Sequence, residues 1–487
     1  MQKNLQYILN NTMTILLIVT VLLAIIVRFY GLTFQSYWFD EIFSIKTSNP
    51  ANSLLYVYNQ TMGDVHPPFY QSLLWFWYQL FGFNEYSGRA LSALVGSFSV
   101  FVIYLLGKEL YNKEVGVYAS LIAATNYFLI LYSQEVRSNI VLFLFSALSY
   151  LYFVKLLKNH SKQNIFFYLL FSILAIYTHY FGFFLLASQI FVFLFYLIID
   201  KEGRARLIKL ALFSALLTLI ALAPLLQRIV EHIHTEGYWM ETPHSLFFID
   251  YLKAYILSPF LQKIFLLLTL ISIGSLFIKK YYSRSTALLF IWIVMGFLLP
   301  YIKSITGFSI LIERSMVIVI PALIIVVAYG IYLLRVYWLK LALIGAIVFL
   351  ALYHLYRMGY YTKVSKDQFR ETLVEIEKRQ GDYVVYDFIM HDFHGNRFQS
   401  HFFDNYGVLI GSNLKILPAV KLKDDYKNKR MPKCFWAVHA HKDFLYNAKI
   451  LTKEGMKKVL TIDKYQAQGV LYAYKTPPKE CLKDKDE

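Results

Sequence analysis

The chain has 487 residues, of which 57% are hydrophobic, 18% aromatic and only 16% charged, and its mean hydropathy is +0.47. These proportions exclude an ordinary soluble globular protein, in which about a quarter of the residues are charged. The formal net charge is +17, but much of that excess follows the Lys and Arg bias of membrane loops, so we expect no nucleic-acid partner. Composition predicts a membrane protein embedded in a lipid bilayer.

Mostly apolar stretches of about 20 residues, the length that a bilayer-spanning helix needs, recur between Asn11 and Arg357. They predict a polytopic α-helical membrane protein with about eleven transmembrane helices. The first run is expected to be a retained anchor, because bulky residues follow it where a signal peptidase requires small ones. The predicted spans are 12–30, 87–107, 116–133, 138–157, 164–178, 182–200, 206–226, 254–278, 285–302, 313–335 and 338–357.

Lys and Arg are distributed unequally between alternate loops. With a cytoplasmic N-terminus, the cytoplasmic loops are rich in basic residues, for example Lys201, Arg204, Arg206 and Lys209, whereas the loops on the other side are poor in them. Because cytoplasmic loops carry the excess of Lys and Arg, we predict a multi-pass protein with a cytoplasmic N-terminus. The long first loop, 31–86, and the C-terminal tail are then extracytoplasmic.

The tail, residues 358–487, is expected to be a soluble extracytoplasmic α/β domain that follows a transmembrane domain over 1–357. Residues 368–379 predict an amphipathic helix with Phe369, Leu373 and Ile376 on one face, and the alternation over 382–387 predicts a strand. Both cysteines, Cys434 and Cys481, fall in this tail, where a disulfide is allowed. The sequence leaves open whether they pair.

The sequence has neither a phosphate-binding Gly-rich loop with a Walker lysine nor the Cys/His spacing of a zinc site. An ATP-driven pump is therefore not expected. Transporters keep functional charges at mid-span, but here the span centres are almost empty of charge. A polytopic transporter or flippase remains the alternative that a transport assay has to test.

The polar groups gather instead in and beside the outer loops. Five stretches follow one another: "GLTFQSYWFDE" from Gly31, "GDVHPPFYQSLLWFWYQLFG" from Gly63, "SGRALSAL" from Ser87, "LYSQEVRSNI" from Leu131 and "ERSMVIVIPALIIVVAYG" from Glu313. In this order they resemble glycosyltransferase family 39, which includes protein mannosyltransferases and aminoarabinose transferases and has the membrane-embedded GT-C fold. The resemblance covers roughly residues 15–335 and is strongest over 28–140.

The resemblance implies an enzyme, an inverting glycosyltransferase of the bacterial cytoplasmic (inner) membrane. Its donor would be a sugar linked to polyprenyl phosphate, and its acceptor a hydroxyl or phosphate of a glycolipid, a protein or a wall polymer at the outer face. A related alternative is a lipid-linked glycan ligase or polymerase. The chemistry of the motifs fits transfer, since a base must take the acceptor's proton and cations must hold the phosphate charge as the glycosidic bond breaks.

The resemblance assigns three acids to catalysis. Asp40, the first acid of the pair, is expected to be the general base, unless it only caps the following helix or pairs with Arg89. Glu41 either supports Asp40, binds acceptor or pairs with an arginine. Glu135 is expected to be a second carboxylate of the site, unless it forms an ion pair with Arg137. No cofactor is certain, and a divalent cation, if present, would be held by Asp40 and Glu135.

The remaining candidates are expected to bind the donor and its phosphate. His66 either contacts the phosphate or orients a carboxylate, and Asp64 shares its motif, although two prolines make a rigid turn the alternative reading. The arginines could instead be ordinary interfacial residues or structural partners. The full donor and phosphate-binding set is His66, Asp64, Arg89, Arg137, Arg314 and Arg28.

Overall fold

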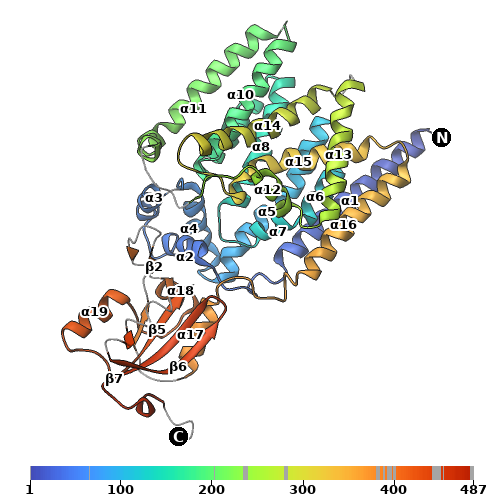
Figure 1. Cartoon of the computed structure of the whole chain (residues 1–487). Coiled ribbons are helices and arrows are strands. Elements are labelled where there is room, and N and C mark those ends of the chain that lie inside the picture. Colours follow the sequence, from blue (N-terminus) through green and yellow to red (C-terminus); the bar gives the residue numbers. More distant parts are fainter. Residues whose placement is uncertain are drawn as a thin grey trace. The chain divides into compact units, whose positions relative to one another are not determined.

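The computed structural model of the chain (Figure 1) describes residues 2–482 except 65, 202, 234–239, 279–282, 380–383, 388–389, 392–396, 399–401, 441–450 and 453–454. The chain forms two compact units, which are treated separately. The first, the membrane unit, comprises Met1–Tyr30, Ser53–Leu74 and Arg89–Tyr360. The second, the sheet unit, comprises Gly31–Asn52, Trp75–Gly88 and Tyr361–Glu487. The sheet unit thus combines segments of the predicted first loop with the tail.

Over the described residues, nine helices are long and apolar enough to cross a membrane, or ten if a bent pair counts as one span. The pair is α6 and α7, with 62° between them. The prediction of a polytopic helical protein is confirmed. The remaining expected span, 164–178, is helix α9, which has 17 residues. The long helices are α1 (Gln2–Phe29), α5 (Glu85–Leu110), α6 (Lys113–Thr125), α7 (Tyr127–Ser133), α8 (Asn139–Lys158), α9 (Lys162–Thr178), α10 (Gly182–Ile199), α11 (Arg204–Ile233), α13 (Pro259–Ile278), α14 (Ser283–Thr306), α15 (Ile320–Tyr332) and α16 (Tyr337–Arg357).

Asn126 explains the bend between α6 and α7. Its backbone is extended, which ends α6, and its side-chain oxygen accepts a hydrogen bond from the backbone N–H of Leu129 at 3.0 Å, which caps α7. Its side-chain nitrogen donates to the backbone carbonyl of Tyr255 at 3.1 Å, at the end of α12 (Phe247–Tyr255). A single asparagine therefore stops one helix, starts the next and fixes both against a third.

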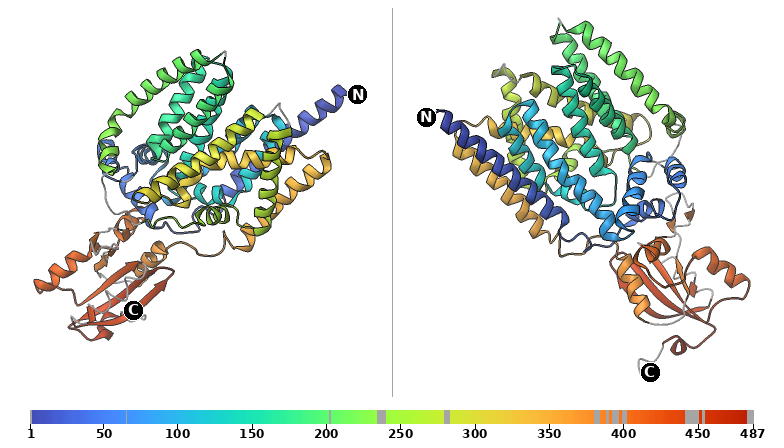
Figure 2. Two further views of the ribbon diagram at one scale, coloured as in Figure 1. Left: turned by 45° about the horizontal axis from the view of Figure 1, so that its top comes forward. Right: turned by 180° about the vertical axis from the view of Figure 1, so that it is seen from behind.

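Small residues allow the long helices to approach closely, as is common in membranes. A Cβ added at Gly107 of α5 would lie 2.9 Å from the Cα of Gly116 of α6, and one at Gly330 of α15 would lie 2.4 Å from the carbonyl oxygen of Leu268 on α13. Helix α6 packs against α1, α15 and α16, within the helical bundle that Figure 2 shows from two further sides. The short 3-10 helix η1 (Glu313–Val319) leads into α15 and packs against α8 and α14.

Two helices belong to the predicted first loop besides α3 (Leu54–Met62): α2 (Phe39–Thr47) and α4 (Phe69–Phe81). The aromatic segment from Leu73 to Phe81 predicts a helix that lies at the membrane interface. Helix α4 covers this segment, and Phe76, Leu80 and Phe81 are each more than half exposed. Large exposed apolar side chains are what a helix at a membrane surface needs. The position of α4 relative to the bilayer remains a prediction.

The tail contains the predicted α/β fold. The strand order is β4-β1-β5-β7-β6, with β1 parallel to β4 and β5, and β7 antiparallel to β5 and β6. A second, two-stranded antiparallel sheet pairs β2 with β3. The strands are β1 (Val384–Asp387), β2 (Met390–His391), β3 (Arg397–Phe398), β4 (Ile416–Pro418), β5 (Cys434–Ala440), β6 (Met456–Lys464) and β7 (Ala467–Tyr474), and the helices α17 (Phe369–Lys378), α18 (Phe402–Ile410), α19 (Ala419–Lys427) and η3 (Pro478–Cys481).

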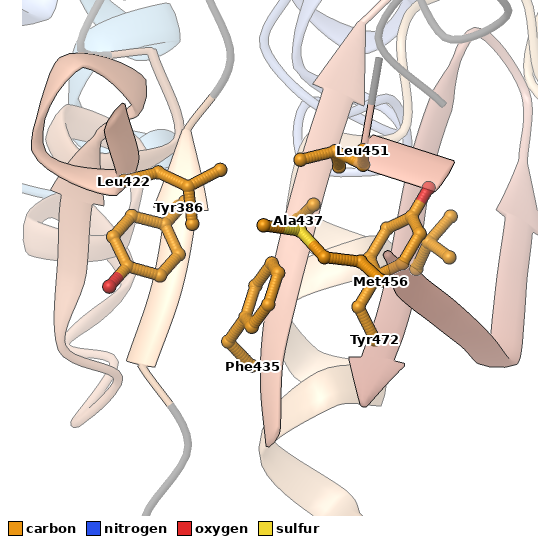
Figure 3. Packing of buried hydrophobic residues seen from close by; sticks show 8 residues of the cluster. Tyr386, Leu422, Phe435, Ala437, Leu451, Met456 and Tyr472 are labelled. Carbon is orange, nitrogen blue, oxygen red and sulfur yellow. The ribbon is translucent and has the colours of Figure 1, made fainter. Parts of the chain in front are cut away.

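Apolar side chains cover both faces of the five-stranded sheet. On one face, Phe435 and Tyr472 stack with ring centroids 5.7 Å apart, and they belong to one apolar cluster with Tyr386 of β1 and Leu422 of α19 (Figure 3). Helix α17 lies on the other face, where Ile376 Cδ1 would be 3.0 Å from a Cβ on Gly469. The predicted buried face of α17, formed by Phe369, Leu373 and Ile376, is confirmed. Of the predicted strand at 382–387, residues 382–383 lie outside the described residues.

The structure pairs Cys434 of β5 with Cys481 of η3 in a disulfide, 47 positions apart in sequence. This resolves what the sequence leaves open. The bond joins the last described segment of the tail to the centre of the sheet.

Candidate functional site

In the membrane unit, the second motif and the second-loop motif meet in a hydrogen-bonded chain. Nδ1 of His66 lies 3.3 Å from Oδ2 of Asp64, and Nε2 of His66 lies 3.2 Å from Nη2 of Arg137, which is 71 positions further along the chain. A guanidinium can only donate. Nε2 of His66 is therefore the acceptor, and its Nδ1–H donates to Asp64, so the imidazole is neutral and links a carboxylate to a cation.

His179, in the turn between α9 and α10, extends this group. Its ring lies edge-on to His66, with centroids 5.4 Å apart, and its Nδ1 accepts the backbone N–H of Phe181 at 3.1 Å. Burial lowers the pKa of the His179 imidazole well below its usual range, and the nearby His66, Arg137 and Arg314 lower it further. His179 is thus a neutral residue in a cationic environment.

Arg314 is the second residue of η1, and its charge acts on His179. Its backbone carbonyl accepts a hydrogen bond from the side chain of Asn139 at 2.9 Å, and Asn139 is the first residue of α8, two positions after Arg137. The side chain of Arg314 is partly exposed, whereas Arg137 is only 5% exposed. Arg137 and Arg314, which come from separate motifs, are therefore both held at the start of α8.

Glu135 lies in the turn between α7 and α8 and is 5% exposed. It is within electrostatic range of Tyr127 and of Tyr132, and Tyr132 in turn is within range of Arg314. The structure thus brings five of the predicted residues into one region of the membrane unit: Asp64, His66, Glu135, Arg137 and Arg314. We call these five residues and His179 the arginine–histidine cluster.

Arg28, at the end of α1, is fully buried and has a different environment. It donates to the backbone carbonyls of Ala123 and Ala124 at 3.0 Å each and to Oγ of Ser133 at 3.1 Å. The last carbonyls of a helix have no partner within the helix, and α6 ends at Thr125. Arg28 satisfies these carbonyls at the bend, which explains its burial without a phosphate. Arg89, on α5, is also buried, with 1% of its surface exposed.

The sheet unit contains the acidic pair. Glu41 is fully buried, its Oε2 lies 3.1 Å from Nζ of Lys366, and the same oxygen accepts the backbone N–H of Trp38 at 3.3 Å. The latter bond is half of a capping box at the start of α2. Glu41 is thus held by an ion pair and by its own helix.

Asp40 is the second residue of α2 and is partly exposed. A carboxylate in the first turn of a helix is favoured by the helix dipole, although the N-cap residue of α2 is Trp38 and not Asp40. The two acids nevertheless differ, because Asp40 retains solvent access and Glu41 has none.

Metal binding through Asp40 and Glu135 finds no support in the geometry. Among the described residues, no group of three or more His, Cys, Asp or Glu side chains is arranged to hold a metal ion. We therefore derive no step through a metal.

Residues 65–227 match the family described as dolichyl-phosphate-mannose-protein mannosyltransferase. The structure resembles that of ArnT from Cupriavidus metallidurans in the apo state, with a TM-score of 0.64 and 13% identity over 93% of this chain and 97% of that chain. The chain has the GT-C fold. The resemblance of its motifs to glycosyltransferase family 39 is confirmed by the family match.

Two further structures agree with this GT-C assignment. ArnT bound to undecaprenyl phosphate matches with a TM-score of 0.62 at 13% identity over 93% of this chain and 97% of that chain. The archaeal oligosaccharyltransferase AglB from Archaeoglobus fulgidus, in complex with an inhibitory peptide and a dolichol-phosphate, matches with a TM-score of 0.57 at 10% identity, over 94% of this chain and 74% of that chain. No curated protein sequence matches the chain.

Four residues that contact the motif segments of this GT-C protein were not predicted from the sequence: His179, Lys366, Glu85 and Arg370. His179 was missed, although a histidine in a short turn on the predicted outer side was an available signal. Lys366 and Arg370 of the tail were missed because nothing in a single sequence links them to Glu41 and Glu85 of the first loop. Their contacts cross more than 280 positions of the chain.

Proposed function

We propose that the chain is an inverting glycosyltransferase that moves a sugar from a polyprenyl-phosphate-linked donor to an acceptor hydroxyl or phosphate at the outer face of the membrane. The observation that carries this proposal is the hydrogen-bonded chain Asp64–His66–Arg137, which joins two of the family's motifs within a GT-C fold. Binding of undecaprenyl phosphate by ArnT and of dolichol-phosphate by AglB supports a lipid-linked donor.

For a hydroxyl acceptor, Asp40 acts as the general base. Its carboxylate takes the acceptor's proton as the acceptor oxygen attacks the anomeric carbon on the face opposite the phosphate. The bond between that carbon and the phosphate oxygen breaks, and its electron pair leaves with the phosphate. Backside attack inverts the anomeric centre. A positioned base contributes about 10²- to 10⁴-fold to such a reaction.

The arginine–histidine cluster stabilises the departing phosphate. A sugar phosphodiester carries one negative charge, and the polyprenyl phosphate that leaves gains a second, so cations placed beforehand favour the transition state. Arg137 and Arg314 supply fixed positive charge. Since His66 accepts from Arg137 and donates to Asp64, these two residues orient the guanidinium rather than bind the phosphate themselves.

The Lys and Arg bias of the loops supports an outward-facing site, and so does the disulfide between Cys434 and Cys481. Disulfides persist in oxidising compartments and are rare in the cytosol. The proposal therefore places both the acidic pair and the tail outside. Labelling of a single cysteine introduced at Asn49 with a membrane-impermeant reagent tests this placement, and labelling only after permeabilisation contradicts it.

The decisive assay uses purified protein in nanodiscs with a radiolabelled polyprenyl-monophosphate sugar and a membrane extract as acceptor source. Transfer predicts a labelled product together with free polyprenyl phosphate, and Asp40→Asn abolishes both while the protein still inserts and remains folded. Consumption of only a diphosphate-linked donor indicates the ligase instead. The same protein in sealed proteoliposomes tests transport, and movement of the intact donor across the bilayer, without cleavage, indicates a flippase.

A further inference from the structure

The segment that carries Asp40 is bonded to the tail at several points within the sheet unit. Ser36 donates from Oγ to Oε2 of Glu371 at 2.6 Å, and the backbone N–H of Tyr37 donates to the hydroxyl of Tyr406 at 2.8 Å. On the other side of Asp40, Lys366 donates to Glu41. The tail therefore holds the chain immediately before and immediately after the proposed base.

A further set of bonds fixes the approach to α2. The side-chain oxygen of Gln35 accepts the backbone N–H of Ser365 at 3.1 Å, and its side-chain nitrogen donates to the carbonyl of Lys363 at 2.7 Å. Arg370 donates to the carbonyls of Thr33 and Phe34 at 2.9 and 3.1 Å. Residues 33–36, which belong to no helix or strand, are thus hydrogen-bonded along their length to residues 363–371.

Burial makes the bond between Lys366 and Glu41 the most specific of these contacts. The Glu41 side chain is 0% exposed and that of Lys366 is 12% exposed. A buried carboxylate without its cation is strongly unfavourable, so Glu41 keeps Lys366 in place. Because Glu41 also closes the capping box, the position of Lys366 is coupled directly to the first turn of α2, which contains Asp40.

We propose that Lys366 and Glu41 are positioning residues for Asp40, so that the C-terminal tail builds the geometry of the catalytic helix. The inference rests on the proposed function of Asp40 as base. It assigns Glu41 to the support of Asp40 rather than to acceptor binding. It also gives the tail a defined task, which is to hold α2 at a fixed orientation for catalysis.

Two variants separate positioning from general stabilisation. K366M removes the cation but leaves a buried carboxylate, so it lowers both kcat and the thermal midpoint. The double variant E41Q/K366M removes both charges, so the thermal midpoint recovers while kcat stays low. Because a displacement of about 1 Å can cost about 100-fold in rate, we expect kcat to fall about 10- to 100-fold in both. The KM for the lipid-linked donor stays within about twofold of the parent, as uniform donor binding is unaffected.

K366R keeps the charge and is expected to retain at least about a third of the parent kcat, since an arginine still pairs with the buried carboxylate. R379M is the matched control. Arg379 pairs with Glu375 at 2.8 Å on α17 of the same unit, but its side chain is 41% exposed, and exposed pairs of this kind contribute little. R379M therefore leaves kcat unchanged.

Hydrogen exchange of the α2 amides measures the same effect without turnover. Exchange at residues 42–47 is expected to be at least about tenfold faster in E41Q/K366M than in the parent or in R379M, because the helix has lost its tether. Unchanged exchange overturns the inference whether or not the protein is active. A parent-like kcat in the double variant also overturns it, by showing that the pair only stabilises. Normal turnover in Asp40→Asn, with fast exchange in E41Q/K366M, instead removes the proposed base and leaves the tether standing.

Discussion

Arg370 Nη1 lies 2.5 Å from Oε2 of Glu85, joining the first turn of α17 to the first residue of α5. The carboxylate of Glu85 also accepts a hydrogen bond from the hydroxyl of Tyr406. Burial of Tyr406 and, second to it, the negative charge of Glu85 raise the pKa of Tyr406 well above its usual value. The arrangement is a partly buried network rather than a single surface ion pair. Networks of this kind depend on every member being satisfied.

Replacement of Arg370 by Met is therefore expected to destabilise the sheet unit by about 2–4 kcal/mol, because it leaves the carboxylate of Glu85 without its cation. The loss is measured by urea unfolding of the full chain, with hydrogen exchange at β5 and β7 as the readout for the sheet unit. The double variant R370M/E85Q is expected to recover part of it. Equal losses in the single and double variants would show that packing, and not charge, stabilises this contact.

Arg28 is expected to matter for stability and not for donor affinity. Met at this position leaves the carbonyls of Ala123 and Ala124 without their donor, at about 1–3 kcal/mol for each unsatisfied group. A lysine recovers only part of this, since an ammonium lacks the planar fork of a guanidinium. Thermal unfolding in detergent measures the loss. A raised donor KM with an unchanged midpoint would instead return Arg28 to the phosphate.

Arg137 and Arg314 are expected to behave in the opposite way. Their replacement by Gln removes a charge-assisted contact to phosphate of about 1.5–3 kcal/mol, which corresponds to a fall of about 10- to 150-fold in kcat/KM for the lipid-linked donor. Arg204→Gln, at the exposed start of α11, is the control for a lost membrane-unit cation. Unchanged donor kinetics in both variants would place the phosphate elsewhere.

The contrast between Arg28 and Arg137 shows what the sequence can and cannot predict. Hydropathy identifies where the spans lie, and periodicity identifies the buried face of α17, because both depend on neighbours close in the chain. Neither pattern can distinguish Arg28 from Arg137. Arg28 donates to the end of α6 at the bend, whereas Arg137 donates to His66, and both contacts join distant parts of the chain. The bond between Ser36 and Glu371 spans 335 positions, and no local pattern encodes it.

The disulfide gives a prediction for both stability and compartment. Cys434 and Cys481 enclose a loop of 47 positions, so the entropy of the unfolded chain makes the bond worth about 4 kcal/mol. Replacing both by Ser is expected to lower the unfolding free energy of the sheet unit by that order. In protein isolated under thiol-blocking conditions, neither cysteine reacts until a reductant is added. Alkylation of both without a reductant would contradict the pairing and the oxidising location together.

His439 predicts how the sheet unit responds to acid. It lies on β5 opposite Gln468 of β7, and burial lowers the pKa of its imidazole from 6.5 to about 3. Above pH 6.5 the side chain is neutral in both the folded and the unfolded chain, so it adds no pH dependence. Below pH 6.5 His439 is protonated in the unfolded chain but stays neutral in the folded chain. The free energy of unfolding therefore falls progressively until about pH 3.

The expected loss is about 1.4 kcal/mol per pH unit within this window, or about 2 kcal/mol between pH 6.5 and pH 5. Urea unfolding of the sheet unit in the full chain measures it at both pH values. His439→Leu has no group to titrate, so its stability is expected to fall by about 2 kcal/mol less over the same interval, while the contributions of all other groups cancel in the comparison. Parallel pH dependence in the two proteins would mean that the imidazole of His439 takes up its proton in the folded state.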